Sequence, residues 1–100
     1  MKTIVVYRTF KTGGETIALF PCEPADSWGN NCQSYMQVGQ HGGASPAIMR
    51  GSTRPATPAE IAPLARELTR IGYDLKPLAN FPRNAMAKRR EAIHRNRKTN

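Results

Sequence analysis

Cys32 and His41 stand nine residues apart, and their side-chain types could together support nucleophilic catalysis. A cysteine attacks as the thiolate, and a neighbouring histidine can take its proton. If residues 32–38 form a strand that rises about 3.3 Å per residue, Cys32 and the segment after Gly39 lie at opposite ends of it. The spacing therefore does not bring the pair together, and we assign no catalytic residue.

A zinc site would draw on the thiolates and imidazoles of the chain. The four candidates are Cys22, Cys32, His41 and His94. Their successive gaps are ten, nine and 53 residues, whereas structural zinc sites take their ligands in close pairs, because a tight turn presents two at once. The sequence therefore predicts no metal site and no cofactor.

Basic side chains are concentrated near the end of the sequence. Residues 83–100 carry seven Lys or Arg and one acid, for a net charge of +6, whereas the first 82 residues have a net charge of +2. The seven are Arg83, Lys88, Arg89, Arg90, Arg95, Arg97 and Lys98. If four or five of them met phosphates of a duplex, counterion release would give a log–log salt slope of about −4. We predict nucleic acid or a ribonucleoprotein as the partner, with an acidic protein surface or a merely solvated tail as alternatives.

Two further features could add to such a surface. Residues 39–43 form a glycine-rich stretch that lacks the phosphate-binding loop motifs, so we predict a polar partner-contacting loop there, with Gln40 and His41 beside Tyr35. Aromatic rings could stack on unpaired bases, although no ribonucleoprotein motif or helix-turn-helix organises them. They are Tyr7, Trp28, Tyr35 and Phe81.

The first half of the chain has the patterns of a small sheet. Residues 3–10 and 16–20 are rich in β-branched and aromatic types around a Gly-Gly turn, which predicts an antiparallel hairpin. Residues 21–31 have prolines and no period, so we predict a loop. Residues 32–38 alternate in polarity and predict a half-buried strand with Cys32 on its more apolar side.

The second half contains one strong helix signal. Residues 39–56 predict a long glycine-rich loop, with room for a short strand at 47–50. A capping box with proline at the first helical position begins at Thr57, and an apolar stripe follows, so we predict a helix over 58–71. Pro63 predicts a kink or loosening near its start. The box and the stripe comprise Thr57, Pro58, Glu60, Ile61, Leu64, Leu68 and Ile71.

The last predicted elements are a strand and a basic helix. Residues 73–79 alternate, and Pro77 favours the edge of a sheet. Asn84 is a suitable N-cap for a helix that frays into a disordered end. The predicted fold is α+β, with a small antiparallel sheet in the order β-β-β-α-β and the amphipathic helix on one face. Residues 1–80 form the domain and residues 81–100 form a basic C-terminal arm.

Length and composition exclude several classes. A chain of 100 residues is one domain, and no apolar run approaches the ~18 residues of a membrane span, so no membrane partner is expected. The first ten residues are typical of a strand rather than a signal peptide, so both cysteines are expected as free thiols in the cytoplasm. The oligomeric state stays open.

Three short motifs carry a family resemblance: a Cys-x-Ser-Tyr strand, a Gly-Gln-His-Gly segment, and a Thr-Pro-x-Glu helix start that leads to Ile-Gly-Tyr. They fall on Cys32, Ser34, Tyr35, Gly39, Gln40, His41, Gly42, Thr57, Pro58, Glu60, Ile71, Gly72 and Tyr73. Through them, residues 1–75 resemble small proteins of bacteriophages and integrative elements of Gram-negative bacteria, although Pro63 departs from the pattern. The resemblance implies an accessory protein that binds a host system, and it brings no assigned chemistry.

These observations predict a non-enzymatic binding module that engages nucleic acid or a nucleoprotein complex through its arm. An inhibitor of a host-defence complex, of the anti-CRISPR or anti-restriction type, is one alternative and implies a host protein complex as partner. A small Cys/His-dependent enzyme is the other.

Overall fold

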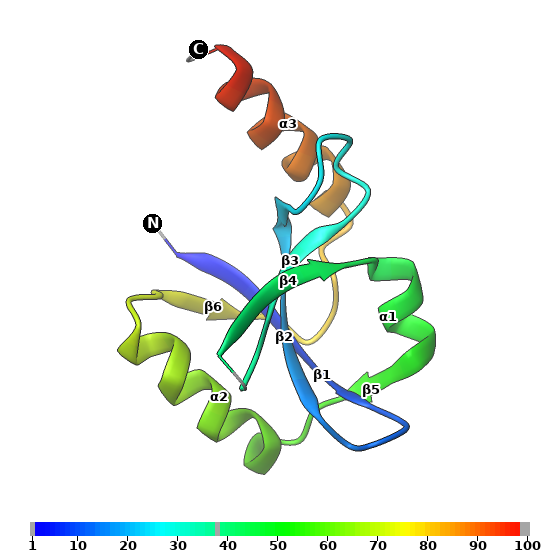
Figure 1. The fold of residues 1–100 in the computed structure, drawn as a ribbon, viewed down its shortest axis with the longest axis vertical. Helices are drawn as coiled ribbons and strands as arrows, with labels where there is room; N and C mark the ends of the chain where they lie inside the picture. The colour runs from blue at the N-terminus through cyan, green and yellow to red at the C-terminus, as the bar shows by residue number, and fades with distance from the viewer. Residues whose placement is uncertain (1, 38, 99–100) are drawn as a thin grey trace.

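The computed structural model describes residues 2–37 and 39–98, and for Gln40 and residues 96–98 it describes the backbone alone. The fold is α+β, as predicted, and contains a largely antiparallel sheet in the order β4-β3-β2-β1-β5, with β6 parallel to β1 (Figure 1). The elements are β1 (Thr3–Phe10), β2 (Thr16–Pro24), β3 (Cys32–Met36), β4 (Gln40–Ala44), α1 (Pro46–Ser52), β5 (Thr53–Pro55), α2 (Pro58–Arg70), β6 (Leu75–Pro77) and α3 (Ala85–Lys98). Within the described ranges, no helix has the length and apolar character needed to cross a membrane.

The predicted hairpin is confirmed, and its second strand is longer than expected. β1 and β2 pair antiparallel, with Val6 opposite Leu19. β2 continues to Pro24, which pairs with Cys32 after a register shift. The predicted loop over residues 21–31 is therefore wrong for residues 21–24. Proline is tolerated there because a bulge does not require its missing N–H.

The predicted long loop over residues 39–56 is also wrong, since it contains β4, α1 and β5. β4 pairs with β3 through backbone groups, which glycines supply as well as any other residue. The strand predicted over residues 32–38 is confirmed for Cys32–Met36, and Val38 lies outside the described residues.

Each face of the sheet has its own apolar cluster. On one face, Phe20 and neighbouring sheet residues pack against Leu64 and Leu68 of α2. On the other, Leu19 and Cys32 pack against Met49 of α1 and Phe81. Burial of apolar surface on both faces is the main stabilising contribution in a chain of this size.

The predicted helix over 58–71 is confirmed as α2, which runs continuously from Pro58 to Arg70 through Pro63. Its capping box is present, because the Thr57 hydroxyl accepts from the Glu60 amide while the Glu60 carboxylate accepts from the Thr57 amide. Arg54 also donates to both carboxylate oxygens of Glu60. Chiefly because of this guanidinium, the pKa of Glu60 is lowered to about 2.

The last two elements have the predicted types. β6 pairs with β1 alone, so Pro77 does lie at an edge of the sheet. α3 begins beside β2 and extends away from the sheet toward the C-terminus (Figure 1). Ala85 and Arg89 in its first turns are buried. The first half of the predicted arm is therefore packed against the body of the protein.

Candidate nucleic-acid interface

Arg89 belongs to the predicted basic arm, but its side chain is buried within the fold. The residue is only 3% exposed. Its Nε donates to the carbonyl oxygen of Gly29 at 2.7 Å, and its Nη1 donates to the carbonyl oxygen of Pro21 at 2.7 Å. Charge-assisted hydrogen bonds of this kind are about twice as strong as neutral ones. Arg89 therefore fastens α3 to β2 and to the loop over residues 25–31, and it is not available to contact a partner.

The loop over residues 25–31 is held in shape by one carboxylate. Asp26 accepts hydrogen bonds from the amides of three following residues, the shortest being 2.7 Å from Gly29, and from the side chain of Asn31. Gly29 has φ +78, a conformation that costs a glycine little. Held in this way, the loop presents Trp28, which is 74% exposed.

A shallow hollow of about 210 Å³ lies beside Trp28. Ser27 completes its loop side, and Arg90, Ile93 and His94 of α3 line the other side. The loop and the helix are in close contact at this point, because a Cβ added to Gly29 would lie 3.0 Å from Cγ of Arg90. The indole and the Arg90 side chain therefore border the same small space.

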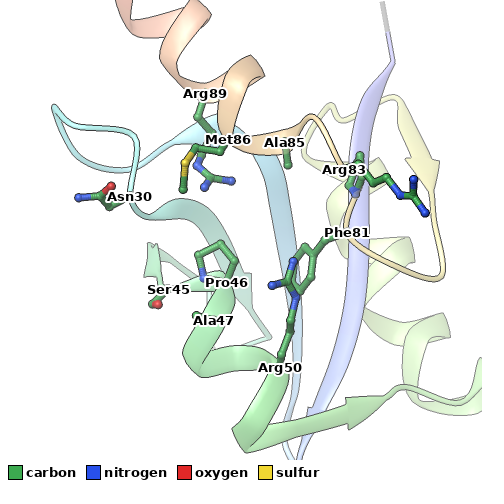
Figure 2. A pocket seen from close by; sticks show the side chains of 11 residues that line it. Asn30, Ser45, Pro46, Ala47, Arg50, Phe81, Arg83, Ala85, Met86 and Arg89 are labelled. Atoms are coloured by element: carbon green, nitrogen blue, oxygen red, sulfur yellow. The ribbon is translucent and has the colours of Figure 1, made fainter.

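A second hollow of about 200 Å³ lies between α1, the segment that leads into α3, and α3 itself (Figure 2). The guanidinium of Arg50 lies over the ring of Phe81, 5.0 Å from its centroid. Met86 and Arg89 lie on the α3 side of this hollow. Figure 2 shows the guanidinium of Arg83 at the rim, directed away from Phe81 and Met86.

A third hollow of about 150 Å³ adjoins the second, since both are lined by Arg50 and Phe81. It adds Arg8, whose Nε and Nη2 donate to the hydroxyl and carbonyl oxygens of Thr53. Arg8 is thereby held in place, whereas Arg50 is exposed and has no carboxylate partner among the described residues.

We call these three hollows together the basic track. Five arginines and one histidine line it, and none of its lining residues is an aspartate or glutamate. They are Arg8, Arg50, Arg83, Arg89, Arg90 and His94. Asp26 is close in sequence, but its oxygens accept hydrogen bonds from its own loop. The track therefore presents positive charge and two aromatic rings, Trp28 and Phe81.

Two other cations of α3 pair with an acid on the same helix. Glu91 lies 4.0 Å from Nζ of Lys88 and 3.6 Å from Nη1 of Arg95. All three side chains are about half exposed or more, and such pairs contribute about 0.5 kcal/mol or less. Arg97 and Lys98 belong to the last turn of α3, and their side chains lie outside the described set.

The predicted contact loop with Tyr35, Gln40 and His41 is not a loop and is not part of the track. These residues belong to β3 and β4. Tyr35 is 4% exposed and donates to a carboxylate oxygen of Glu67 at 3.2 Å. The exposed His41 has its Nε2 2.9 Å from the hydroxyl of Tyr73. The side chain of Gln40 is not described. Tyr35 therefore has a structural role, and His41 is engaged at the α2 side of the sheet.

The Cys32 and His41 pair is also separated. His41 lies opposite Tyr35 in the β-ladder. Because side chains alternate between faces, His41 and Cys32 lie on opposite faces of the sheet. Burial raises the pKa of the Cys32 thiol to about 11, which disfavours the thiolate. These two residues therefore do not form the nucleophile and base of an enzyme.

The four candidate zinc ligands are likewise not gathered into one site. Within the described part of the chain, no three side chains of His, Cys, Asp or Glu are grouped so that they could hold a metal ion. Both cysteines are free thiols, as the sequence suggests, and Cys32 is buried whereas Cys22 is partly exposed.

Sequence patterns alone did not reveal part of the track. Arg50 lies outside the basic arm, on a helix α1 that was not expected, whereas Trp28 and Phe81 are among the rings predicted to stack on bases, without a position beside the arm. One signal for α1 was present, because Ser45-Pro46 repeats the cap-then-proline pattern of Thr57-Pro58, and the Ser45 hydroxyl accepts from the amide of Ile48. Comparison of the chain with protein-family models, with curated proteins and with solved structures found no match.

Proposed function

We propose that this protein binds nucleic acid through the basic track, as a binding module. The observation that carries the proposal is the make-up of the three hollows, where arginines from four separate parts of the chain meet without an opposing carboxylate. Three of these arginines are exposed: Arg50, Arg83 and Arg90. Each of them adds an attractive electrostatic interaction with a polyanion, and the residues that line the track carry no negative charge to repel it.

Two aromatic rings among the cations favour a nucleic acid over an acidic protein surface. Phosphates bind to cations, and bases stack on aromatic or guanidinium planes, so a nucleic acid uses both components. The guanidinium of Arg50 lies over the ring of Phe81, and a guanidinium that lies over an aromatic ring can still donate hydrogen bonds to a phosphate.

The outer half of α3 would extend this surface. Arg95 forms an exposed ion pair with Glu91 that contributes little to stability. Arg95 can therefore leave Glu91 and bind a phosphate at little cost in free energy. Arg97 and Lys98 follow within the same helix. The arm therefore adds non-specific affinity, while the track fixes where the strand lies.

Fluorescence anisotropy with a short labelled oligonucleotide at low salt tests the proposal. Arg50→Gln and Arg90→Gln are each expected to weaken binding about fivefold, or about 1 kcal/mol. Arg66→Gln is the matched control, because Arg66 is an exposed arginine of α2, which packs on the other face of the sheet. Equal affinity of all three variants and the wild type would contradict the proposal, as would the absence of binding to both DNA and RNA.

A further inference from the structure

We propose that the hollow beside Trp28 takes an unpaired nucleobase, so that the protein prefers single-stranded to double-stranded nucleic acid. This inference rests on the proposed function and adds the class of nucleic acid. Trp28 is 74% exposed, although an indole side chain is among those that gain most from burial. An exposed flat ring that lines a hollow can stack on a ligand that is also flat.

The loop geometry shows that this exposure is built in. The Asp26 carboxylate accepts from the amides of residues 28–30 and from the side chain of Asn31, while Arg89 donates to the carbonyl oxygen of Gly29. Asp26 is two residues before Trp28 in the loop, and Arg89 is bonded to Gly29, the residue that follows Trp28. A stacking platform fixed before binding loses little conformational entropy when a base arrives.

The residues around the Trp28 ring favour a nucleotide as the ligand of this hollow. The α3 lining of the hollow combines the polar side chains of Arg90 and His94 with the apolar side chain of Ile93, and no carboxylate lines it. A base stacked on the indole would place its own phosphate near the guanidinium of Arg90. An apolar protein segment would leave that cation without a partner, whereas a nucleotide satisfies the ring and the charge together.

A duplex cannot use this arrangement without local opening. Its bases already stack on one another, and only their edges are reached from the grooves. A single strand can turn a base onto Trp28 and continue along the track toward Arg50 and Phe81. Stacking of a base on an aromatic side chain is worth about 1–3 kcal/mol, which a duplex would forgo.

Trp28 is the sole tryptophan of the chain, so its fluorescence reports directly on the hollow. The protein would be titrated with a short oligothymidine, with a duplex of the same length, and with an abasic strand of that length. We expect strong quenching by oligothymidine. The duplex should quench weakly, and the abasic strand should bind without comparable quenching.

Two variants separate stacking from charge in an anisotropy experiment. Trp28→Leu should weaken binding of oligothymidine at least about fivefold, the lower limit for one stacked base, whereas Trp28→Phe should retain most of the affinity. Urea unfolding should show that both variants keep the wild-type stability, because the side chain is exposed.

Each contrary result has a distinct meaning. If Trp28→Leu binds oligothymidine as the wild type does, or if the duplex or the abasic strand quenches equally, the inference is wrong while the proposed function stands. If no nucleic acid of any kind changes the anisotropy at low salt, both are wrong.

Discussion

The Nε of Arg89 lies 2.7 Å from the carbonyl oxygen of Gly29, and this bond joins α3 to the loop that presents Trp28. The next residue along the helix, Arg90, has its side chain at the surface and borders the hollow beside the indole. Two adjacent arginines therefore have different roles, since Arg89 holds the loop to the helix and Arg90 is exposed at the hollow where we propose that a ligand binds.

This difference predicts a large loss of stability for one alanine variant and almost none for the other. Arg89→Ala leaves the carbonyls of Gly29 and Pro21 without their buried donor and should lower the free energy of unfolding by about 2–4 kcal/mol. Arg90→Ala should change it by less than about 0.5 kcal/mol. Urea unfolding monitored by circular dichroism measures both values. Equal stability of the two variants would show that the Arg89 bonds do not hold the helix.

Gly29→Ala is expected to disturb the loop in two ways, through the backbone strain of a positive φ and through a steric contact with Arg90. Gly29 and Gly14 both have positive φ, so alanine at either should cost about 1–2 kcal/mol. At Gly29 the new methyl would also lie 3.0 Å from Cγ of Arg90, whereas nothing lies within 4 Å at Gly14. Only Gly29→Ala should therefore shift the emission of Trp28. An unchanged emission spectrum in Gly29→Ala would argue against the tight packing of loop and helix.

The ion pair at the start of α2 predicts a dependence of stability on pH. The pKa of Glu60 is lowered from 4.5 to about 2 in the folded protein. The carboxylate therefore stabilises the fold above its unfolded pKa, and this stabilisation is lost as the pH falls toward 2. Glu60→Gln should have a lower melting temperature than the wild type at neutral pH. The difference should shrink in acid, and a constant difference across the acidic range would contradict the pairing.

The two cysteines should differ in reactivity. Cys32 is buried with a pKa of about 11, so iodoacetamide should modify it at the rate at which the protein unfolds. Burial also raises the pKa of Cys22, but its side chain is partly exposed. Peptide mass spectrometry should therefore find Cys22 alkylated first. Rapid alkylation of native Cys32 would show that this strand opens locally.

The same thiol predicts a loss of stability in alkali. Between its ordinary pKa of 9.0 and the folded value of about 11, Cys32 keeps its proton in the folded protein while the unfolded chain loses it. Stability should therefore fall as the pH rises through this interval. Cys32→Ala should lack that part of the pH dependence.

Local signals explain which elements were predictable. The β1–β2 hairpin and the capped helix α2 have strong patterns within a few residues of sequence, and both were confirmed. β4 has two glycines among its five residues, and its strand form comes from pairing with β3, which no local pattern encodes. Tertiary pairing commonly overrides weak local preference in this way.

The proposed interface was predictable only in part, because it too depends on contacts between distant parts of the chain. The charge of the arm is plain in the sequence, but the burial of Arg89 depends on carbonyls 60 and 68 residues away. The hollow around Phe81 needs α1 and α3 to meet.

A chain shortened to Pro82 would remove Arg89 together with the arm, so a chain ending at His94 is the better test of the distal cations.

The most direct measurement is the salt dependence of binding to oligothymidine by the wild type and by a variant with Arg50, Arg83 and Arg90 all changed to Gln. Single strands give a slope of about −0.7 per phosphate contact in a plot of log affinity against log salt. The triple variant should therefore have a slope shallower by about 2, and Arg66→Gln should match the wild type. Parallel lines for the triple variant and the wild type would show that the strand does not lie on the basic track.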